Sequence, residues 1–428
     1  MKTAQDRDRS VAIGPPGQPV SCRGRVKERT RVQWRLGDPG RPDEVVRAAL
    51  AENGVLVDLG DTLTHRYDTT LRHGFVECLP RCDLADNPGT VCGAAVLISA
   101  AACNLIAGRD PGPVTPAIGV PDVAVVVYEH GVPDPVPAVP QVPWTVGPWR
   151  RSWTAEAHAA AVRQVRGAIS RGEVYQVNVV GHWSAPYQGD PSAALARIAS
   201  LSGARYAGII AGDGWAVGCA SPEALVTVVD GWIETRPIKG TRPATEQGRT
   251  ELLGSAKERA EHVMIVDLER NDLSRVAQTG SVRVAELFGI RRWCQLWQAE
   301  SVVQARLAAG VGVTDLLAAL CPGGSVTGAP KLAAIDQIAA REPVGRGPSM
   351  GAFGFVTPNS VNLGLTIRTV AFDGGAEGGT AHVWAGGGIT WSSDPVSEVA
   401  EAEAKAAPLL AAIDRPRPAG AEVPSVTR

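Results

Sequence analysis

The sequence predicts an α+β fold built on large antiparallel β-sheets. Its strand-like segments occur in runs, without the strict alternation of strands and helices that is typical of a parallel sheet. Side-chain character alternates over residues 215–221 (WAVGCAS) and 224–230 (ALVTVVD), as expected for antiparallel strands with one buried face. A chain of 428 residues can hold two or three domains, or one large enzyme fold with a deep core.

The first third of the chain is predicted to contain three segments. Residues 1–42 are rich in Arg, Gly and Pro with little periodicity, so we expect a disordered extension. Residues 43–131 form an N-terminal subdomain, with a helix at 43–50 (DEVVRAAL) and a buried strand at 123–128 (VAVVVY). The prolines of residues 132–149 favour extended backbone and predict a linker.

Residues 150–412 are predicted to form the larger domain, followed by a flexible tail over 413–428. Thr154 can cap its first helix. Helices are expected at 154–171, 255–278, 314–321, 330–341 and 395–413, and strands at 174–180, 351–355, 361–371 and 381–384.

Charge and composition exclude several classes of protein. The formal net charge is −2, so no overall field would attract nucleic acid or an anionic membrane. Residues 1–10 (MKTAQDRDRS) are charged and predict no secretory signal. The longest apolar stretch, 94–107, is shorter than the roughly 20 residues that a spanning helix needs. The eight cysteines show no metal-ligand spacing. We therefore expect a cytoplasmic protein with reduced thiols.

The run ETRPIKGT at residues 234–241 contains a candidate reactive lysine. It places Lys239 in a predicted tight turn, with Arg236 and Arg242 on either side. A free lysine has a pKa of about 10.4 and is a poor nucleophile near neutral pH. Cationic neighbours and burial both disfavour the ammonium form, which makes a lysine reactive. Taken alone, the run could also be a surface turn with scattered positive charge.

Two predicted helices each carry a pair of carboxylates three residues apart. Glu258 and Glu261 share one face of the first helix, and Glu398 and Glu401 share one face of the last. Carboxylates that converge inside a protein repel one another unless a proton or a cation intervenes. Mg²⁺ takes one or two carboxylates from a protein and keeps waters, so the pairs predict a magnesium site.

Both pairs also have ordinary explanations. Ser255 and Glu258 have the spacing of a helix capping box, and Glu401 and Lys405 have that of an i,i+4 salt pair. Glu261, however, immediately precedes the hydrophobic run HVMIVDL, which favours a buried carboxylate.

Two glycine-rich segments could supply backbone N–H donors to an anion. Residues 385–388 (AGGG) are predicted to form a loop after a strand, and residues 322–331 (PGGSVTGAPK) lead into a helix N-terminus. The second segment has the GxxxxG spacing of a nucleotide-binding P-loop. Ala329, Pro330 and Lys331 follow where Lys-Ser/Thr is required, which argues against ATP binding.

Further polar residues lie in strand or loop contexts that could face a cavity. An arginine inside a strand, such as Arg368, needs an anionic partner if it is buried, and the alternative is an edge strand that points it to solvent. The candidates are Gln176, Thr327, Arg368 and Lys405.

Taken together, these motifs resemble those of the chorismate-binding enzyme family. Its members include the first components of anthranilate synthase and aminodeoxychorismate synthase, and the isochorismate and salicylate synthases. The resemblance covers residues 150–412 and implies a large two-layer α/β sandwich with extensive antiparallel sheets, holding chorismate and Mg²⁺ at its centre. It rests on GEVYQVN (172–178), ASPE (220–223), ETRPIKGTRP (234–243), KERAEHVMIVDLERNDLSRV (257–276), PGGSVTGAPK (322–331), GAFGF (351–355), TIR (366–368) and GGGIT through EAEAKAAPLL (386–410).

The resemblance also implies roles for individual residues. Glu261 and Glu401 resemble the magnesium ligands of the family, with Glu398 beside them in the metal set and Glu258 as a supporting catalytic carboxylate. The groups that resemble the family's substrate-binding residues are Gly386, Gly387, Gly388, Arg368 and Lys405, with Thr327 as a hydrogen-bonding wall residue.

Two positions divide the chemistries within the family. Isochorismate and salicylate synthases have a water-activating lysine at the position of Gln176, and glutamine cannot act as that base. Anthranilate synthases usually have alanine at the position of Lys239. The resemblance is therefore closest to aminodeoxychorismate synthase component I. It implies that the lysine attacks ring carbon 2 as the 4-hydroxyl leaves with Mg²⁺ assistance. Ammonia then adds at carbon 4 and expels the lysine, giving 4-amino-4-deoxychorismate for para-aminobenzoate and folate synthesis.

The sequence departs from the family pattern at two places. Gln298 stands where many relatives have histidine, and it can hydrogen-bond a leaving hydroxyl but cannot protonate it. Ser349 stands where an aromatic residue often lies. No amidotransferase segment is visible, so the resemblance implies a separate glutamine amidotransferase that supplies ammonia. The alternatives are an anthranilate-type or 2-amino-2-deoxyisochorismate-type chorismate aminase, and a non-catalytic chorismate-binding protein.

Overall fold

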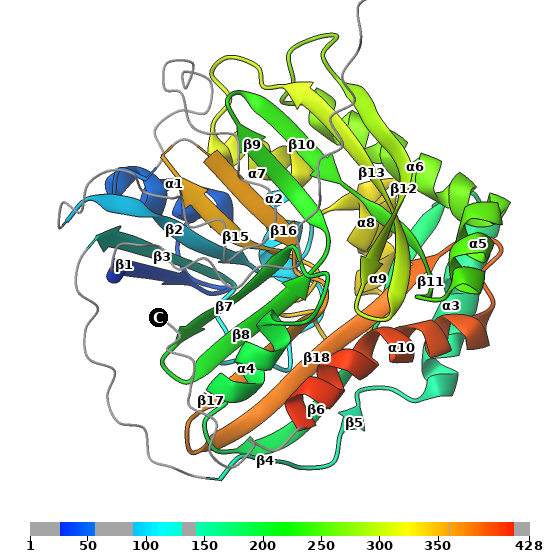
Figure 1. Ribbon diagram of the computed structural model, residues 1–428, viewed down its shortest axis with the longest axis horizontal. Helices are drawn as coiled ribbons and strands as arrows, with labels where there is room; N and C mark the ends of the chain where they lie inside the picture. The colour runs from blue at the N-terminus through cyan, green and yellow to red at the C-terminus, as the bar shows by residue number, and fades with distance from the viewer. Residues whose placement is uncertain (1–25, 56–88, 131–142, 359, 415–428) are drawn as a thin grey trace, which may run out of the picture.

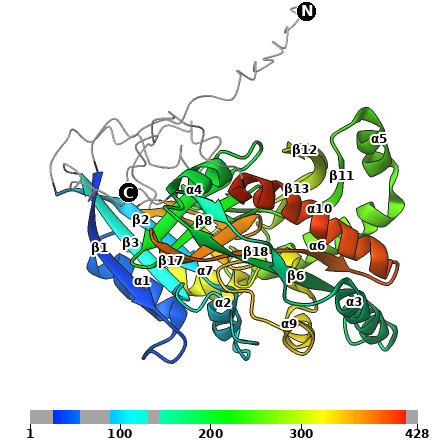
Figure 2. The ribbon, with the colours of Figure 1, turned by 90° about the horizontal axis from the view of Figure 1, so that it is seen from below.

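Two antiparallel sheets pack face to face, with helices on their outer sides (Figures 1 and 2). The computed structural model describes residues 26–55, 89–130, 143–358 and 360–414. The first sheet has ten strands in the spatial order β1 (Val26–Trp34), β3 (Val123–His130), β2 (Val91–Ile98), β15 (Ala352–Thr357), β16 (Ser360–Leu365), β9 (Ala224–Val229), β10 (Trp232–Arg236), β13 (Leu296–Arg306) and β11 (Ile238–Pro243), with β12 (Arg283–Trp293) also paired to β13.

The second sheet has eight strands and carries the longest ladder, between β6 and β18. Its order is β14 (Gly328–Ala329), β6 (Gln176–Gln188), β18 (Gly378–Ile389), β17 (Thr369–Gly375), β8 (Trp215–Ser221) and β7 (Tyr206–Gly212), while β4 (Thr145–Val146) and β5 (Arg150–Arg151) also pair with β6. Every strand pair in the described ranges is antiparallel, which confirms the prediction of antiparallel sheets.

The helices cover both outer faces. They are α1 (Pro42–Glu52), α2 (Ala100–Ile106), α3 (Ala155–Ser170), α4 (Ser192–Ala199), α5 (Glu246–Gly254), α6 (Ala256–Ser274), α7 (Val313–Leu320), α8 (Gly324–Thr327), α9 (Lys331–Ala339) and α10 (Pro395–Asp414). The predicted helices correspond to α1, α3, α6, α7, α9 and α10. Within the described ranges, no helix is both long and apolar enough to cross a membrane.

Two hydrophobic cores hold these layers together. The larger one lies between the sheets and continues under α1, α2 and α7, and it joins Trp384 of the second sheet to Phe353 of the first. The other core packs α4 and α10 on the outer face of the second sheet, through Leu195, Phe372 and Leu409. Figures 1 and 2 show α10 lying along β18, which places its first turns near one end of the sandwich.

Side-chain caps fix where two helices begin. Ser255 Oγ accepts a hydrogen bond from the backbone N–H of Glu258 at 3.2 Å, and α6 starts at the next residue. Thr154 caps α3 in the same way, through a 3.1 Å bond from the N–H of Ala157, as predicted. The Ser255 cap sets the rotation of α6 and therefore the direction in which its carboxylates point.

Some expectations about chain organisation were wrong. Residues 26–34, predicted as part of the extension, form β1 and pair with β3. The expected N-terminal subdomain shares a sheet with the larger domain, because β2 pairs with β15. β1 is an edge strand whose sequence, VKERTRVQW, is rich in charged residues and carries weak apolar periodicity, which explains the error. Residues 1–25, most of the predicted linker (132–142) and residues 415–428 of the predicted tail lie outside the described residues.

The predicted strand over residues 361–371 is in fact two strands. β16 ends at Leu365 in the first sheet and β17 begins at Thr369 in the second, so the chain crosses between sheets at residues 366–368. Arg368 turns the chain there with a φ of 52°. An apolar run reads the same whether it stays in one sheet or changes sheet, so periodicity could not reveal the crossover.

Candidate active site

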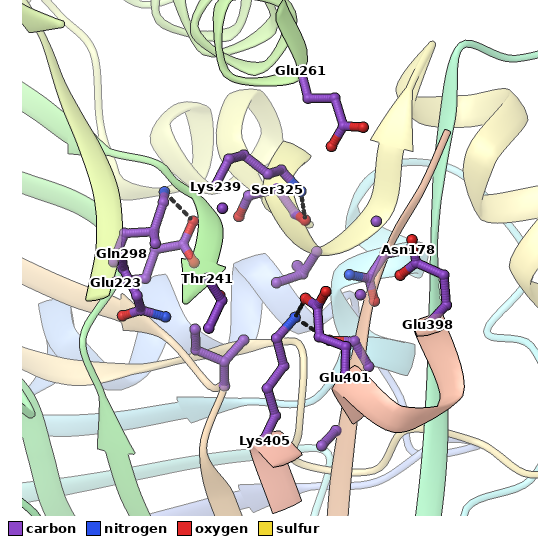
Figure 3. A pocket seen from close by; sticks show the side chains of 18 of the residues that line it. Asn178, Glu223, Lys239, Thr241, Glu261, Gln298, Ser325, Glu398, Glu401 and Lys405 are labelled. Atoms are coloured by element: carbon purple, nitrogen blue, oxygen red, sulfur yellow. Dashed lines mark hydrogen bonds and ion pairs between the residues drawn. The ribbon is translucent and has the colours of Figure 1, made fainter. Parts of the chain in front are cut away.

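A cavity lies between the two sheets, with an empty volume of about 830 Å³ that includes the space at its mouth. The strands β6, β18, β11 and β13 and the helices α6, α8 and α10 all contribute to its wall (Figure 3). The candidate residues that line it are Lys239, Glu258, Glu261, Gln298, Arg368, Gly386, Gly387, Gly388, Glu398, Glu401 and Lys405. The structure therefore brings together all of the predicted site residues except Thr327 and Gln176, from segments up to 166 positions apart in sequence (405 minus 239).

Lys239 lies in strand β11 and not in the predicted turn. It pairs with Ala299 of β13, and the register shifts at Gly240, whose φ is 76°. Its Nζ donates a 3.1 Å hydrogen bond to the backbone carbonyl of Ser325, and no carboxylate among the described residues forms an ion pair with it. The residue is partly exposed, and it lines the cavity. Burial lowers the pKa of Lys239 from its ordinary value, which favours the neutral amine.

The predicted contribution of Arg236 and Arg242 to this pKa was wrong. Arg236 pairs with Glu234 at 2.5 Å and with Glu300 at 3.3 Å. Arg242 donates to Glu258 at 3.1 Å. Burial is the largest cause that lowers the Lys239 pKa, and the cation that also lowers it is Lys405 of α10. Neighbours in sequence have their own carboxylate partners here, whereas a residue distant in sequence supplies the positive charge.

Glu223 is a buried site residue that the sequence reasoning missed. It lies between β8 and β9, is 3% exposed, and its Oε1 accepts a 3.1 Å hydrogen bond from the backbone N–H of Ile238. Burial raises its pKa, while the nearby Lys239 amine opposes the shift. Figure 3 shows Glu223 beside Lys239 at one end of the cavity. A single carboxylate between two apolar strands, in the segment ASPE, was the signal that could have identified it.

The carboxylates of α6 and α10 approach the cavity from two sides (Figure 3). Burial raises the pKa of Glu261, whose Oε1 accepts a 2.6 Å hydrogen bond from Thr390 Oγ1. Burial, and then the charge of Glu401, raise the pKa of Glu398 to about 7. Lys405 Nζ lies 2.6 Å from Glu401 Oε1 and lowers the pKa of that carboxyl. The pKa values of Glu261 and Glu398 are thus raised, whereas that of Glu401 is lowered.

The ordinary roles weighed for these carboxylates are also present. Ser255 caps the backbone of Glu258, and Glu401 forms the i,i+4 ion pair with Lys405. Neither role takes the side chains out of the cavity, because Glu258, Glu401 and Lys405 all line it. Lys405 Nζ also donates a 2.8 Å hydrogen bond to the carbonyl of Gly386.

These carboxylates fit Mg²⁺ through the chemistry of the donor set. A Cβ atom on Gly387 would lie 3.1 Å from Glu398 Oε2 and 3.6 Å from Glu401 Oε1, so the two acids converge over this glycine. Within the described ranges, no group of three or more His, Cys, Asp or Glu side chains is arranged to hold a metal ion, so a pair of carboxylates is the most that these residues offer. An open, oxygen-only set suits Mg²⁺, which takes one or two protein carboxylates and completes its shell with water and ligand oxygens.

The glycines at 386–388 lie within β18, which corrects the predicted loop. They pair with Val180, Val179 and Asn178 of β6. Their missing side chains make room for neighbours: a Cβ atom on Gly388 would lie 3.0 Å from Lys239 Nζ and 2.9 Å from the amide carbon of Gln176. A run of glycines does not distinguish a loop from a strand that other groups approach closely, so the sequence could not settle this.

Arg368 presents a positive charge to the cavity. The residue is 5% exposed, and its guanidinium has no hydrogen bond or ion pair to any described residue. It lies 4.5 Å from the centroid of the Trp293 ring. Burial lowers the pKa of Arg368 to about 10, so the side chain is charged at neutral pH. Glu401 and Glu223 act on it through their charge without contacting it, so the guanidinium can still bind the anionic group of a ligand.

Of the remaining residues named from the sequence, one lines the cavity and the others do not. Gln298 of β13 is 4% exposed and lines the cavity. Thr327 does not line it, and its Oγ1 donates a 2.8 Å hydrogen bond to the carbonyl of Gly323 at the start of α8. Ser349 is fully buried and donates to the carbonyl of Thr366 at 3.2 Å. Gln176 is fully buried behind Gly388, and neither atom of its amide has a hydrogen-bond partner among the described residues.

The sequence profile of the chorismate binding enzymes matches residues 124–411. The chain belongs to the chorismate binding enzyme family. The matched region contains every residue that lines the cavity.

Curated relatives in this family carry two names. Aminodeoxychorismate synthase component 1 of Klebsiella aerogenes is 38% identical over 260 residues, which are 59% of this chain and 57% of that protein. The protein of the same name from Bacillus subtilis (strain 168) is 34% identical over 282 residues, covering 64% and 58%. Anthranilate synthase component 1 of Thermus thermophilus is 36% identical over 273 residues, covering 62% and 58%. The chain therefore spans a little over half the length of these relatives.

Solved structures of chorismate-related enzymes share the fold. Anthranilate synthase component I from Streptococcus pneumoniae TIGR4 superposes with a TM-score of 0.70 at 23% identity, covering 94% of this chain and 95% of that one. The menaquinone-specific isochorismate synthase of Escherichia coli gives a TM-score of 0.59 at 16% identity, covering 92% and 96%. These similarities confirm the α+β sandwich that the resemblance implied.

Proposed function

We propose that this chain aminates chorismate at carbon 4, yielding 4-amino-4-deoxychorismate, with ammonia supplied by a glutamine amidotransferase subunit. The observation that carries the proposal is the position of Lys239. Its amine faces the cavity, burial favours its neutral form, and its one hydrogen bond among the described residues is to a carbonyl oxygen. An amine in this state is a nucleophile. The relatives named aminodeoxychorismate synthase component 1, at 34% to 38% identity, support the same reaction.

In the proposed reaction, Lys239 Nζ forms a bond to ring carbon 2, the ring double bonds shift, and the bond from carbon 4 to its hydroxyl breaks. The leaving hydroxide takes up a proton and departs as water. Ammonia then bonds to carbon 4, the double bonds shift back, and the bond from Nζ to carbon 2 breaks, returning the electron pair to the lysine. The new ammonium nitrogen releases its extra proton and the departing lysine nitrogen takes up a proton, so Lys239 returns as a neutral amine.

Two buried side chains are placed to assist. Glu223 lies beside Lys239 with its pKa raised by burial, so it can accept the proton that the lysine releases and hand it on. Gln298 lines the cavity and can donate a hydrogen bond to the leaving hydroxyl, although it cannot protonate it.

Glu261 and Glu401 would hold Mg²⁺, with Glu398 and Glu258 beside them. When bound, Mg²⁺ supplies positive charge that stabilises anionic oxygens of the substrate. Arg368 is the proposed partner of a substrate carboxylate, because its guanidinium has no protein anion. Lys405 orients Glu401 and the backbone of Gly386, and it adds positive charge to the same wall.

A coupled assay tests the proposal. Purified protein with chorismate, Mg²⁺ and ammonium, together with a 4-amino-4-deoxychorismate lyase, is expected to release para-aminobenzoate. Lys239→Ala is expected to abolish this release while leaving chorismate binding intact. Undiminished turnover in Lys239→Ala would overturn the covalent role of the lysine.

The same assay separates the competing functions. Anthranilate synthase component 1 relatives at 36% identity, and the TM-score of 0.70 to an anthranilate synthase, favour anthranilate formation as the second candidate. Fluorescent anthranilate produced without the lyase would support that reading. Tight binding of chorismate with no product would indicate a chorismate-binding protein without catalysis.

A further inference from the structure

Trp293 and Arg368 form a stacked pair at the edge of the cavity. The guanidinium carbon of Arg368 lies 4.5 Å from the centroid of the indole ring. Trp293 is the last residue of β12 and is completely buried. Arg368 lines the cavity, and Trp293 does not. The indole therefore supports the arginine from behind.

The backbone of Ala220 in β8 forms a second link between Arg368 and Trp293. Its backbone N–H donates a 3.0 Å hydrogen bond to the carbonyl of Arg368, and its carbonyl accepts a 3.0 Å hydrogen bond from the indole N–H of Trp293. These contacts join three segments of the chain: β8 of the second sheet, the end of β12 in the first sheet, and the crossover at residues 366–368. Both the backbone and the side chain of the arginine are held by it.

The conformation of Arg368 requires such support. Its backbone φ of 52° lies in the left-handed region, which residues other than glycine rarely adopt. Its Nε has no hydrogen-bond partner among the described residues, and no carboxylate of the described chain forms an ion pair with the guanidinium. The indole ring attracts the charged guanidinium by a cation–π contact, which needs no hydrogen-bond acceptor.

We infer that Trp293 is a positioning residue, which fixes the guanidinium of Arg368 so that its free N–H groups meet a carboxylate of the bound substrate. The inference rests on the proposed function for the identity of that substrate. It goes beyond the proposal by assigning substrate orientation to a residue that does not touch the cavity. A planar, fixed guanidinium binds a planar carboxylate through two parallel hydrogen bonds, which a mobile cation does not do.

Binding of chorismate to three variants tests the inference. Trp293→Leu is expected to raise the dissociation constant about tenfold, equivalent to about 1.4 kcal/mol. Trp293→Phe keeps a ring face and is expected to restore most of the affinity. In turnover assays, Trp293→Leu is expected to raise KM by a similar factor and to change kcat less than twofold. Trp232→Leu is the matched control, because Trp232 stacks on Arg283 and Arg306 at distances of 5.0 Å and 4.3 Å outside the cavity.

A double-mutant cycle separates positioning from general packing. If Trp293 acts through Arg368, Trp293→Leu adds nothing to the loss of affinity caused by Arg368→Ala. Additive losses, or an unchanged dissociation constant in Trp293→Leu, would overturn the inference. An unchanged constant in Arg368→Ala would instead count against the proposed role of Arg368 and would overturn the inference with it.

A measurement without substrate tests the geometry even if chorismate is not the ligand. The Nε–H signal of Arg368, assigned by its loss in Arg368→Lys, is expected to carry an upfield ring-current shift in NMR spectra of the wild-type protein. Trp293→Leu should abolish this shift and Trp293→Phe should retain part of it. If Trp293→Leu does not fold, Trp293→Phe alone gives the intermediate shift. A wild-type signal without a ring-current shift would reject the stacked arrangement.

Discussion

Gly388 of β18 lies directly against Lys239 of β11, so that a Cβ atom on the glycine would be 3.0 Å from the lysine Nζ. The same Cβ atom would lie 2.9 Å from the amide carbon of Gln176. The two strands belong to different sheets, and this contact is where the sheets meet at the candidate nucleophile. The absence of a side chain at this position leaves the amine free to reach a ligand.

Gly388→Ala is therefore expected to displace the Lys239 amine and to lower kcat by about tenfold or more, since small displacements of a reacting group are costly. Gly375→Ala is the control, because a Cβ atom at Gly375 meets nothing within 4 Å. Steady-state turnover and thermal unfolding of both variants give the comparison. Equal kcat in Gly388→Ala and wild type would show that Lys239 does not need this space.

The rate of turnover is expected to rise with pH as Lys239 loses its proton. Burial holds the pKa of Lys239 below its ordinary value, so the rising limb should have its midpoint below the free-lysine value of about 10.4. The negative charge of Glu223 raises the Lys239 pKa. Glu223→Gln should therefore move the midpoint to lower pH while reducing the plateau. A midpoint that moves upward in this variant would contradict the assignment.

Activity is expected to require Mg²⁺ and to vanish with chelator. Glu261→Gln and Glu401→Gln should each lower Mg²⁺ affinity about tenfold or more, measured by metal titration in a binding assay. Because the pKa of Glu398 is about 7, protons compete with the metal, and affinity should fall as pH drops below 7. Glu403→Gln is the control on the same helix, since Glu403 pairs with Arg151 and does not line the cavity. Full Mg²⁺ affinity in Glu261→Gln or in Glu401→Gln would show that the substituted residue is not a metal ligand.

The buried pair His182 and His382 is expected to oppose folding in acid. Their ring nitrogens lie 3.1 Å apart, and burial lowers the pKa of His182 to about 3 and of His382 to about 4. Between pH 6.5 and 4 the unfolded chain binds protons that the folded chain excludes, so each histidine costs stability as pH falls.

Relative to wild type, His382→Gln should gain stability as pH falls from 6.5 to 4, by up to about 1.4 kcal/mol per pH unit. Comparison with wild type is needed because buried carboxyls titrate with the opposite sign in this range. Urea unfolding at several pH values provides the measurement. A stability difference that does not vary with pH would show that His382 is not excluded from protonation.

Glu269 of α6 is expected to give the opposite dependence of folding stability on pH. Burial, followed by the charge of Asp272, raises its pKa to about 8, and its Oε2 accepts a 3.2 Å hydrogen bond from Thr235. Its folded pKa lies above the unfolded value, so its contribution to stability is lost as pH rises from about 4.5 to 8. Glu269→Gln should therefore become more stable relative to wild type over that range, while exposed Asp267→Asn on the same helix should not. No relative gain up to pH 8 would show that Glu269 is ionised in the folded protein.

Local sequence signals located α1, α3, α6, α7, α9 and α10 but not α2, α4, α5 and α8, and they showed which carboxylates share a helix face. The spacing of Glu258 and Glu261, and of Glu398 and Glu401, predicted two carboxylate pairs, and both pairs line the cavity. The capping residue Ser255 was readable because a cap acts within one turn of its helix. Lys239 was identified from its motif, but its strand and its charged neighbours were not.

The chain by itself determined the fold class, the family and most of the chemical groups at the cavity, because helical and strand periodicity and short motifs depend on neighbours within a few residues. Only the tertiary structure decided that Glu223 lies beside Lys239 and that Arg368 turns between sheets against Trp293. These contacts join residues that are far apart in sequence. They depend on which sheet each strand enters and on the close packing between sheets, and neither leaves a periodic signal in the sequence.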